Sequence, residues 1–255
     1  MENERLKNAV EFMLYTYYKL DFSSDTTKEK IFDTAIRKAY SDATNQGAYN
    51  TLVKDNAEAE KIKNEYNVKV KNIIIDKINK LNECSEFSQE IYDSWFHDAC
   101  NVLVNNYKDV KINGTDKEAF TYGNAQKIVN MTMKYLAMLI EVFSVFDENR
   151  DIVIVYGKLF DKIYKYLHSP VDSFIIEAVW NRDEEIDGIP YIYEKLNKNK
   201  PGAYSSEKYI SWSKWEDKEV YDNFKNLIFE IANKENKCPL DWEGTNWIEI
   251  SKKRK

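Results

Sequence analysis

Two lysines and an asparagine stand in the most apolar stretch of the sequence, YGNAQKIVNMTMKYLAMLI, at residues 122–140. At about 100° per residue of helix, Lys127, Asn130 and Lys134 fall within an arc of roughly 60°. Glu141 falls in the same arc, and nearly every other position is apolar. Because a buried lysine is costly unless it is paired or hydrated, this stripe faces either a thin solvent-exposed edge or a polar pocket.

The residues that lead into this stretch could add to an anion site. Tyr122, Asn124 and Gln126 lie just before or within the expected first turn, where backbone N–H groups are free and carry a partial positive charge. Together with Lys127, Asn130 and Lys134 they would suit a phosphate, a nucleotide or a nucleic-acid backbone. The sequence contains no G-x-x-x-x-G-K phosphate loop, so such a site would be built differently.

The second candidate for chemistry is the segment HSPVDS at residues 168–173. As a helix start it is explained by Ser169 as N-cap, Pro170 at the first helical position and Asp172 in the first turn. His168 is not explained by this pattern, and it could act as a general acid or base, or bind phosphate when protonated. Both interpretations remain open at this point.

Helix lengths predict that these two segments meet. A short turn near residue 149 should send a helix at about 152–167 back antiparallel to one at about 125–146. His168 lies 19 residues after that turn and Lys127 lies 22 residues before it. We therefore expect His168, Asp172 and Lys127 to converge on one polar site.

Two further clusters are weaker candidates for a functional site. Trp212 and Trp215 in YISWSKWED could anchor a helix or form a wall on which a ring stacks. His97 and Cys100 share a helical face, but no second pair of metal-ligand spacing accompanies them, so we predict a structural pair. No metal site and no cofactor are predicted.

Two fragments resemble the helix-hairpin-helix DNA glycosylases. In that family a glycine-rich hairpin precedes a catalytic lysine, and a Pro-Val-Asp sequence carries a catalytic aspartate. The matching fragments here are YGNAQK and SPVDS. The resemblance implies Lys127 as nucleophile and Asp172 as activating carboxylate. It covers about a dozen residues, only Gly123 of the paired hairpin glycines is present, and 45 residues separate the lysine from the aspartate.

The composition and the periodicity predict a mainly α-helical protein. The 255 residues include only 7 Gly and 4 Pro, fewer turn residues than an all-β fold of this length would need. We predict one irregular helical bundle over 1–255, with little or no β structure and a central buried helix at about 125–146. Residues 45–68 are predicted to be a hinge or insertion. The C-terminal stretch from 238 to 250 is predicted to be irregular, with a short strand as the alternative.

Charge and cysteine content restrict the functional class. The net charge of −6 argues against a protein that coats nucleic acid, although a local basic groove remains possible. Three cysteines without a C-x-x-C pair favour a reducing compartment, and the charged N-terminus lacks a signal-peptide pattern, so we expect a soluble cytoplasmic protein. No membrane span is expected.

Three functions therefore remain in view. The first is binding, or processing, of a phosphate-bearing ligand such as a nucleotide or nucleic acid at a polar site between two helices. The second is a non-enzymatic interaction protein or oligomer, suggested by 18 Tyr, 12 Phe and 6 Trp. The third is a glycosylase-like enzyme, as the resemblance implies.

Overall fold

The protein is helical throughout the part of the chain that the structure describes. The computed structural model describes residues 2–44, 57–108, 120–180, 212–216 and 218–254. No strand occurs within these ranges, which confirms the predicted mainly α fold. The described α-helices are α1 (Glu2–Tyr18), α2 (Lys28–Thr44), α4 (Ala57–Asn82), α5 (Gln89–Tyr107), α6 (Tyr122–Phe146), α7 (Asp151–Ile163), α8 (Ser173–Trp180), α10 (Lys218–Lys234) and α11 (Pro239–Lys253).

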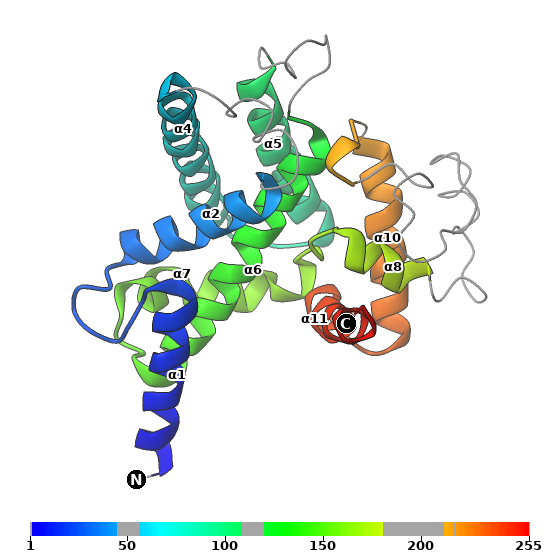
Figure 1. Cartoon of the computed structure of the whole chain (residues 1–255). Coiled ribbons are helices and arrows are strands. Elements are labelled where there is room, and N and C mark those ends of the chain that lie inside the picture. The colour runs from blue at the N-terminus through cyan, green and yellow to red at the C-terminus, as the bar shows by residue number, and fades with distance from the viewer. Residues whose placement is uncertain (1, 45–56, 109–119, 181–211, 217, 255) are drawn as a thin grey trace.

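Helix α6 forms the centre of the molecule, as predicted for residues 125–146. It packs against α2, α5 and α7, and most of its side chains from Tyr122 to Phe143 are buried. In Figure 1, α6 crosses the middle of the molecule, with α8, α10 and α11 gathered beyond one end and α1 projecting near the other. Among the described residues, only α6 is long and apolar enough to cross a bilayer, but its burial by neighbouring helices makes it a core helix.

A capping box sets the start of α6 three residues before the predicted one. The Thr121 side chain accepts a hydrogen bond from the Asn124 backbone, and the Asn124 side chain accepts one from the Thr121 backbone. These reciprocal bonds satisfy backbone groups that the first helical turn leaves unpaired. The polar residues Asn124 and Gln126 therefore belong to the helix itself.

The chain reverses after α6 and reaches α8 by a route that differs in detail from the prediction. Helix α7 ends at Ile163, a 3₁₀ turn follows at Tyr164–Tyr166, and α8 begins at Ser173. Asp172 caps α8, because its Oδ1 accepts hydrogen bonds from the backbone N–H groups of residues 174 and 175. The prediction of Ser169 as the cap was wrong, because the chain is not helical before Ser173 and Asp172 supplies the capping oxygen.

The C-terminal segment corrects the prediction of irregular or strand structure. Residues Pro239–Lys253 form α11, which packs against α8 and α10. Trp242, Asn246 and Ile250 recur every four residues and are all buried, so tertiary packing outweighs the poor helix propensity of Gly244 and Thr245. Of the hinge or insertion predicted at 45–68, residues 45–56 lie outside the described ranges and 57–68 belong to α4.

Candidate functional site

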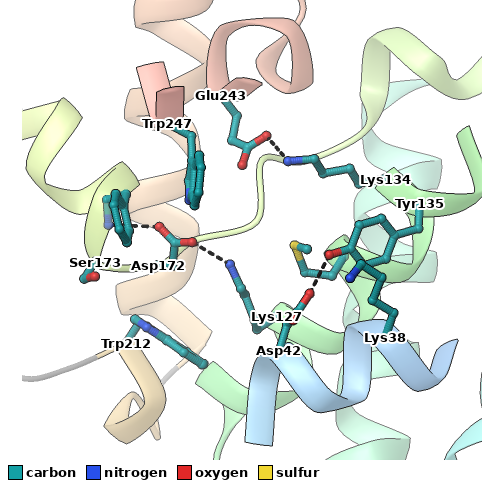
Figure 2. A pocket seen from close by; sticks show the side chains of 12 residues that line it. Lys38, Asp42, Lys127, Lys134, Tyr135, Asp172, Ser173, Trp212, Glu243 and Trp247 are labelled. Carbon is teal, nitrogen blue, oxygen red and sulfur yellow. Dashed lines mark hydrogen bonds and ion pairs between the residues drawn. The ribbon is translucent and has the colours of Figure 1, made fainter. Parts of the chain in front are cut away.

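A pocket opens beside α6 where five parts of the chain meet. Its volume is about 510 Å³, and Figure 2 shows charged and aromatic side chains that converge on it from α2, α6, α8, α11 and the segment around Trp212. We call it the Lys127 pocket. It is lined by Lys38, Asp42, Lys127, Met131, Lys134, Tyr135, Asp172, Ser173, Phe174, Trp212, Glu243 and Trp247.

Lys127 and Asp172 form an ion pair in this pocket. Lys127 Nζ lies 2.8 Å from Asp172 Oδ2, and the two side chains are only 5% and 17% exposed. Burial alone would raise the pKa of Asp172, but the charge and hydrogen bond of Lys127 and the two N–H groups at the start of α8 lower it below its usual value. Asp172 is therefore an ionised carboxylate at neutral pH, within hydrogen-bonding distance of the Lys127 amine.

A second lysine–carboxylate pair lies about two turns further along the same face of α6. Lys134 Nζ is 2.6 Å from Glu243 Oε2, and the glutamate side chain is 2% exposed. Burial raises the pKa of Glu243 above its usual value, although the charges of Lys134 and Lys127 oppose this shift. The polar stripe predicted on α6 thus faces a pocket at both lysines, and each lysine meets a carboxylate from a later helix.

The remaining walls of the pocket combine aromatic rings with a third polar pair. The Tyr135 hydroxyl donates to Asp42 Oδ2 at 2.5 Å, and the Lys38 ammonium lies 5.7 Å from the Tyr135 ring centroid. On the opposite wall, Trp247 stacks on Phe174 with a centroid distance of 4.9 Å. These faces are suited to contact a flat ring, because aromatic surfaces stack favourably on planar groups.

The start of α6 does not offer the free N–H groups expected of an anion site. The Gly123 N–H donates to the Trp215 carbonyl oxygen at 2.9 Å, and the Asn124 N–H bonds to Thr121. The side chains of Tyr122, Asn124 and Gln126 are buried away from the pocket. Their partners are, in turn, His97 Nδ1, the Ala43 carbonyl and the Val171 carbonyl.

His168 lies in a different cluster, which we call the His168 network and which comprises Asn130, Asp93, His168, Tyr221 and Lys225. The His168 side chain is 0% exposed, with Nε2 2.7 Å from Asp93 Oδ1 and Nδ1 2.9 Å from the Tyr221 hydroxyl. Lys225 also pairs with Asp93, and Asn130 donates to Tyr221. Burial outweighs the attraction of Asp93 and lowers the pKa of His168 to about 4, so the ring is neutral near pH 7.

The expected convergence is therefore only partly realised. Lys127 and Asp172 meet, and Gln126 bonds to the backbone just before Asp172, so the 168–172 segment does lie along the N-terminal half of α6. His168 and Asn130, however, point into the His168 network, and neither lines the pocket. His97 pairs with Tyr122 and Asp222, and among the described residues no cluster of three potential metal ligands occurs.

Most residues that line the pocket were not predicted from the sequence. Glu243 and Trp247 stand four residues apart on α11, a helix that was predicted to be irregular, so their shared face could not be recognised. Lys38 and Asp42 have the same spacing on α2, but their polar character alone resembles an ordinary solvent face. No protein-family model, no curated protein and no solved structure matches this chain.

Proposed function

We propose that this protein removes a base from nucleic acid, with Lys127 as the amine nucleophile and Asp172 as its supporting carboxylate. The observation that carries the proposal is the Lys127–Asp172 pair, at 2.8 Å in a pocket of about 510 Å³. The pair joins residues 45 apart in sequence and coincides with the roles implied by the resemblance to helix-hairpin-helix glycosylases. Lysine amines form covalent Schiff-base intermediates with carbonyl carbons in enzymes, and an opened sugar presents such a carbon at C1′.

The reaction can be written with the residues of the pocket. Asp172 accepts a proton from the Lys127 ammonium, and the freed amine attacks C1′ of the target nucleotide. The N–C1′ bond forms as the glycosidic bond breaks, and the base leaves with the bonding electron pair and takes a proton from solvent. Ring opening of the sugar then gives a Schiff base between Lys127 and C1′, which water hydrolyses. Asp172 is ionised before this step, as a proton acceptor must be, and its lowered pKa makes the proton transfer from Lys127 uphill.

The shape and lining of the pocket support a base as the bound group. Its volume lies within the range of roughly 300–1,000 Å³ that is usual for small-molecule sites. Enzymes that act on a base turn it out of the duplex into such a pocket, where aromatic side chains stack on it. The rings of Phe174 and Trp247 line the pocket and are available for this contact.

The charges in the pocket favour amine chemistry over capture of a free phosphate. Lys127 and Lys134 are each paired with a carboxylate, and the pocket contains a further carboxylate at Asp42. An isolated phosphate would have to compete with these carboxylates for the same ammonium groups. The phosphate-bearing ligand expected from the sequence is thus best taken as a nucleic-acid strand whose backbone stays at the mouth of the pocket.

A trapping experiment tests this function. Duplexes that each carry one altered base, such as a deaminated, alkylated or oxidised one, are incubated with the protein and sodium borohydride, which reduces a Schiff base to a stable amine. We expect one duplex class to give a covalent adduct that peptide mass spectrometry assigns to Lys127. Lys127→Gln should abolish the adduct, and Lys253→Gln, a change at an exposed lysine of α11, should leave it intact. Base release by Lys127→Gln at the wild-type rate, or no adduct with any duplex, would refute the proposal.

Exposed apolar side chains on α1 favour a second candidate, self-association. Leu6, Met13 and Tyr17 are 56%, 57% and 65% exposed and lie on one side of this projecting helix, with Phe12 nearby at 73%. Sedimentation velocity of wild type and of a Met13→Ser/Tyr17→Ser variant tests it. The wild type should form dimers that the variant lacks, while Ile154→Ser, at an equally exposed apolar side chain of α7, should still dimerise. A wild type that sediments only as a monomer would eliminate this candidate.

A further inference from the structure

The short segment around Trp212 is fixed across the start of α6. It contains a 3₁₀ turn, η2 (Trp212–Lys214), and two of its backbone carbonyls bond to α6: the Trp215 oxygen accepts from Gly123 N–H at 2.9 Å, and the Ser213 oxygen accepts from Thr121 Oγ1 at 3.0 Å. Trp215 is 2% exposed and packs on Phe224, with ring centroids 5.7 Å apart. The segment is therefore held against the helix by backbone bonds and by a buried ring.

Gly123 is the residue that permits this close approach. A Cβ atom at position 123 would lie 1.7 Å from the Trp212 carbonyl oxygen and 2.8 Å from its carbonyl carbon. Both are backbone atoms, so the overlap could be relieved only by moving the segment as a whole. By contrast, a Cβ at Gly244 in α11 would meet nothing within 4 Å.

Trp212 presents its ring to the amine that the proposed function uses. Lys127 Nζ lies 5.9 Å from the centroid of the Trp212 ring, and Asp172 approaches the same nitrogen at 2.8 Å. Figure 2 shows the Lys127 amine directed toward Asp172, with Trp212 below the pair. The Trp212 side chain is itself 7% exposed, so it covers the amine with a ring that cannot swing freely into solvent.

From this geometry we propose that Trp212 is a positioning residue for Lys127, seated by Gly123, and that it aims the amine into the pocket while shielding it from bulk water. The inference rests on the proposed function only for its consequence in base removal; the contact itself can be tested without nucleic acid. A cation over an indole face is attracted to it, and Asp172 fixes the amine from the other direction. A reacting nitrogen displaced by about 1 Å can lose on the order of a hundredfold in rate.

The first test compares Trp212→Leu, Trp212→Phe and Gly123→Ala with Gly244→Ala. Alanine raises the helix propensity at both glycine positions. The two glycine variants therefore differ only in the overlap with the Trp212 backbone, which Gly123→Ala creates and Gly244→Ala does not. For single-turnover trapping at saturating duplex, we expect Trp212→Leu and Gly123→Ala to be slower on the order of tenfold to a hundredfold. Trp212→Phe should restore most of the rate because it keeps a ring face, and the duplex Kd should stay unchanged in all four.

The second test needs no nucleic acid. A small aldehyde with sodium cyanoborohydride alkylates accessible lysines, and mass spectrometry measures the extent at each position. Loss of the Trp212 shield should make labelling of Lys127 faster in Trp212→Leu and in Gly123→Ala, although the same variants trap duplex more slowly. Lys225, buried in the His168 network, serves as the internal reference for global unfolding and should not change.

These opposite directions separate positioning from damage to the fold. Unfolding would raise the labelling of Lys127 and Lys225 together, whereas loss of the Trp212 shield would raise the labelling of Lys127 alone. The labelling of Lys127 in Gly123→Ala and in Trp212→Phe is then the decisive comparison, because the first variant displaces the Trp212 segment and the second keeps a ring in place. Unchanged or slower labelling of Lys127 in both Gly123→Ala and Trp212→Leu would overturn the inference, as would duplex trapping at the wild-type rate. If no duplex reacts with the wild type, the proposed function fails, and the labelling result alone decides whether Trp212 covers the amine.

Discussion

The Lys127 pocket and the His168 network draw on the same side-chain chemistry and share helix α6, but they differ in access. Each contains a lysine paired with an aspartate: Lys127 with Asp172 in the pocket, and Lys225 with Asp93 in the network. In the network the paired charges already balance and both nitrogens of the His168 ring have partners. In the pocket the pair borders open volume.

This difference indicates which cluster can react and which can only stabilise. A group whose partners are all supplied by the fold has no direction from which a substrate can approach. The histidine, which by residue type is the stronger catalytic candidate, is therefore the structural group here. The lysine and the aspartate, which by residue type look like a surface ion pair and a helix cap, are the groups with access to a ligand.

The largest expected effect comes from removing the carboxylate of the network. Asp93→Ala leaves Lys225, which is 7% exposed, without its closest counter-charge, and leaves His168 Nε2 with only the longer contact to Gln89 Nε2 at 3.4 Å. We expect about 4 kcal/mol of lost unfolding free energy in urea denaturation, the usual cost of breaking a buried ion pair. Asp76→Ala, which breaks the exposed pair with Lys80, should cost only a small fraction of that. Equal costs for the two variants would contradict the assignment of the network as the stabilising cluster.

The next effect is a pH dependence of stability that comes from His168. Burial lowers the pKa of His168 from 6.5, its usual value in an unfolded chain, to about 4 in the folded protein. As the pH falls from about 7.5 to 4, the unfolded chain binds a proton that the folded chain does not, so stability should decrease by roughly 3 kcal/mol. His168→Gln should flatten this part of the profile, measured as unfolding free energy against pH. A profile for His168→Gln that parallels the wild type would show that another group causes the loss.

A somewhat smaller effect is expected in the pocket, and it should appear in rate and not in stability. Asp172→Asn removes the proton acceptor but keeps an oxygen that can cap α8. We expect the rate of duplex trapping to fall about a hundredfold, equivalent to about 2.7 kcal/mol of barrier. The loss of unfolding free energy should be smaller than that of Asp93→Ala. A variant that traps at the wild-type rate would remove Asp172 from the proposed chemistry.

The fold class and the position of the central helix could be predicted because they depend on local patterns. The apolar periodicity of residues 125–146 is strong enough to specify a buried helix without knowledge of its neighbours. The contact between Lys127 and Asp172 could also be predicted. Two antiparallel helices of similar length bring the residues just after the second helix back beside the start of the first. These are the parts of the site that short-range geometry determines.

The remainder of the site depends on contacts that no local pattern contains. His168 looked free because its partners Asp93 and Tyr221 are 75 and 53 residues away in sequence. Glu243 and Trp247 were missed because α11 is helical through burial against α8 and α10, despite a glycine and a threonine in its middle. The family resemblance placed Gly123 in a hairpin, whereas in the structure its lack of a side chain leaves room for the backbone of Trp212.

The central position of α6 also has a consequence for how the protein is synthesised. Helices that cover α6 come from both sides of it in sequence, and roughly a hundred residues separate the end of α6 from the end of α11. At about 5–20 residues per second of translation, part of its apolar surface waits roughly 5–20 seconds for its last partners to leave the ribosome. Truncated chains that end soon after Phe146 should therefore be readily digested by protease and bound by chaperones, and chains that include α11 should not.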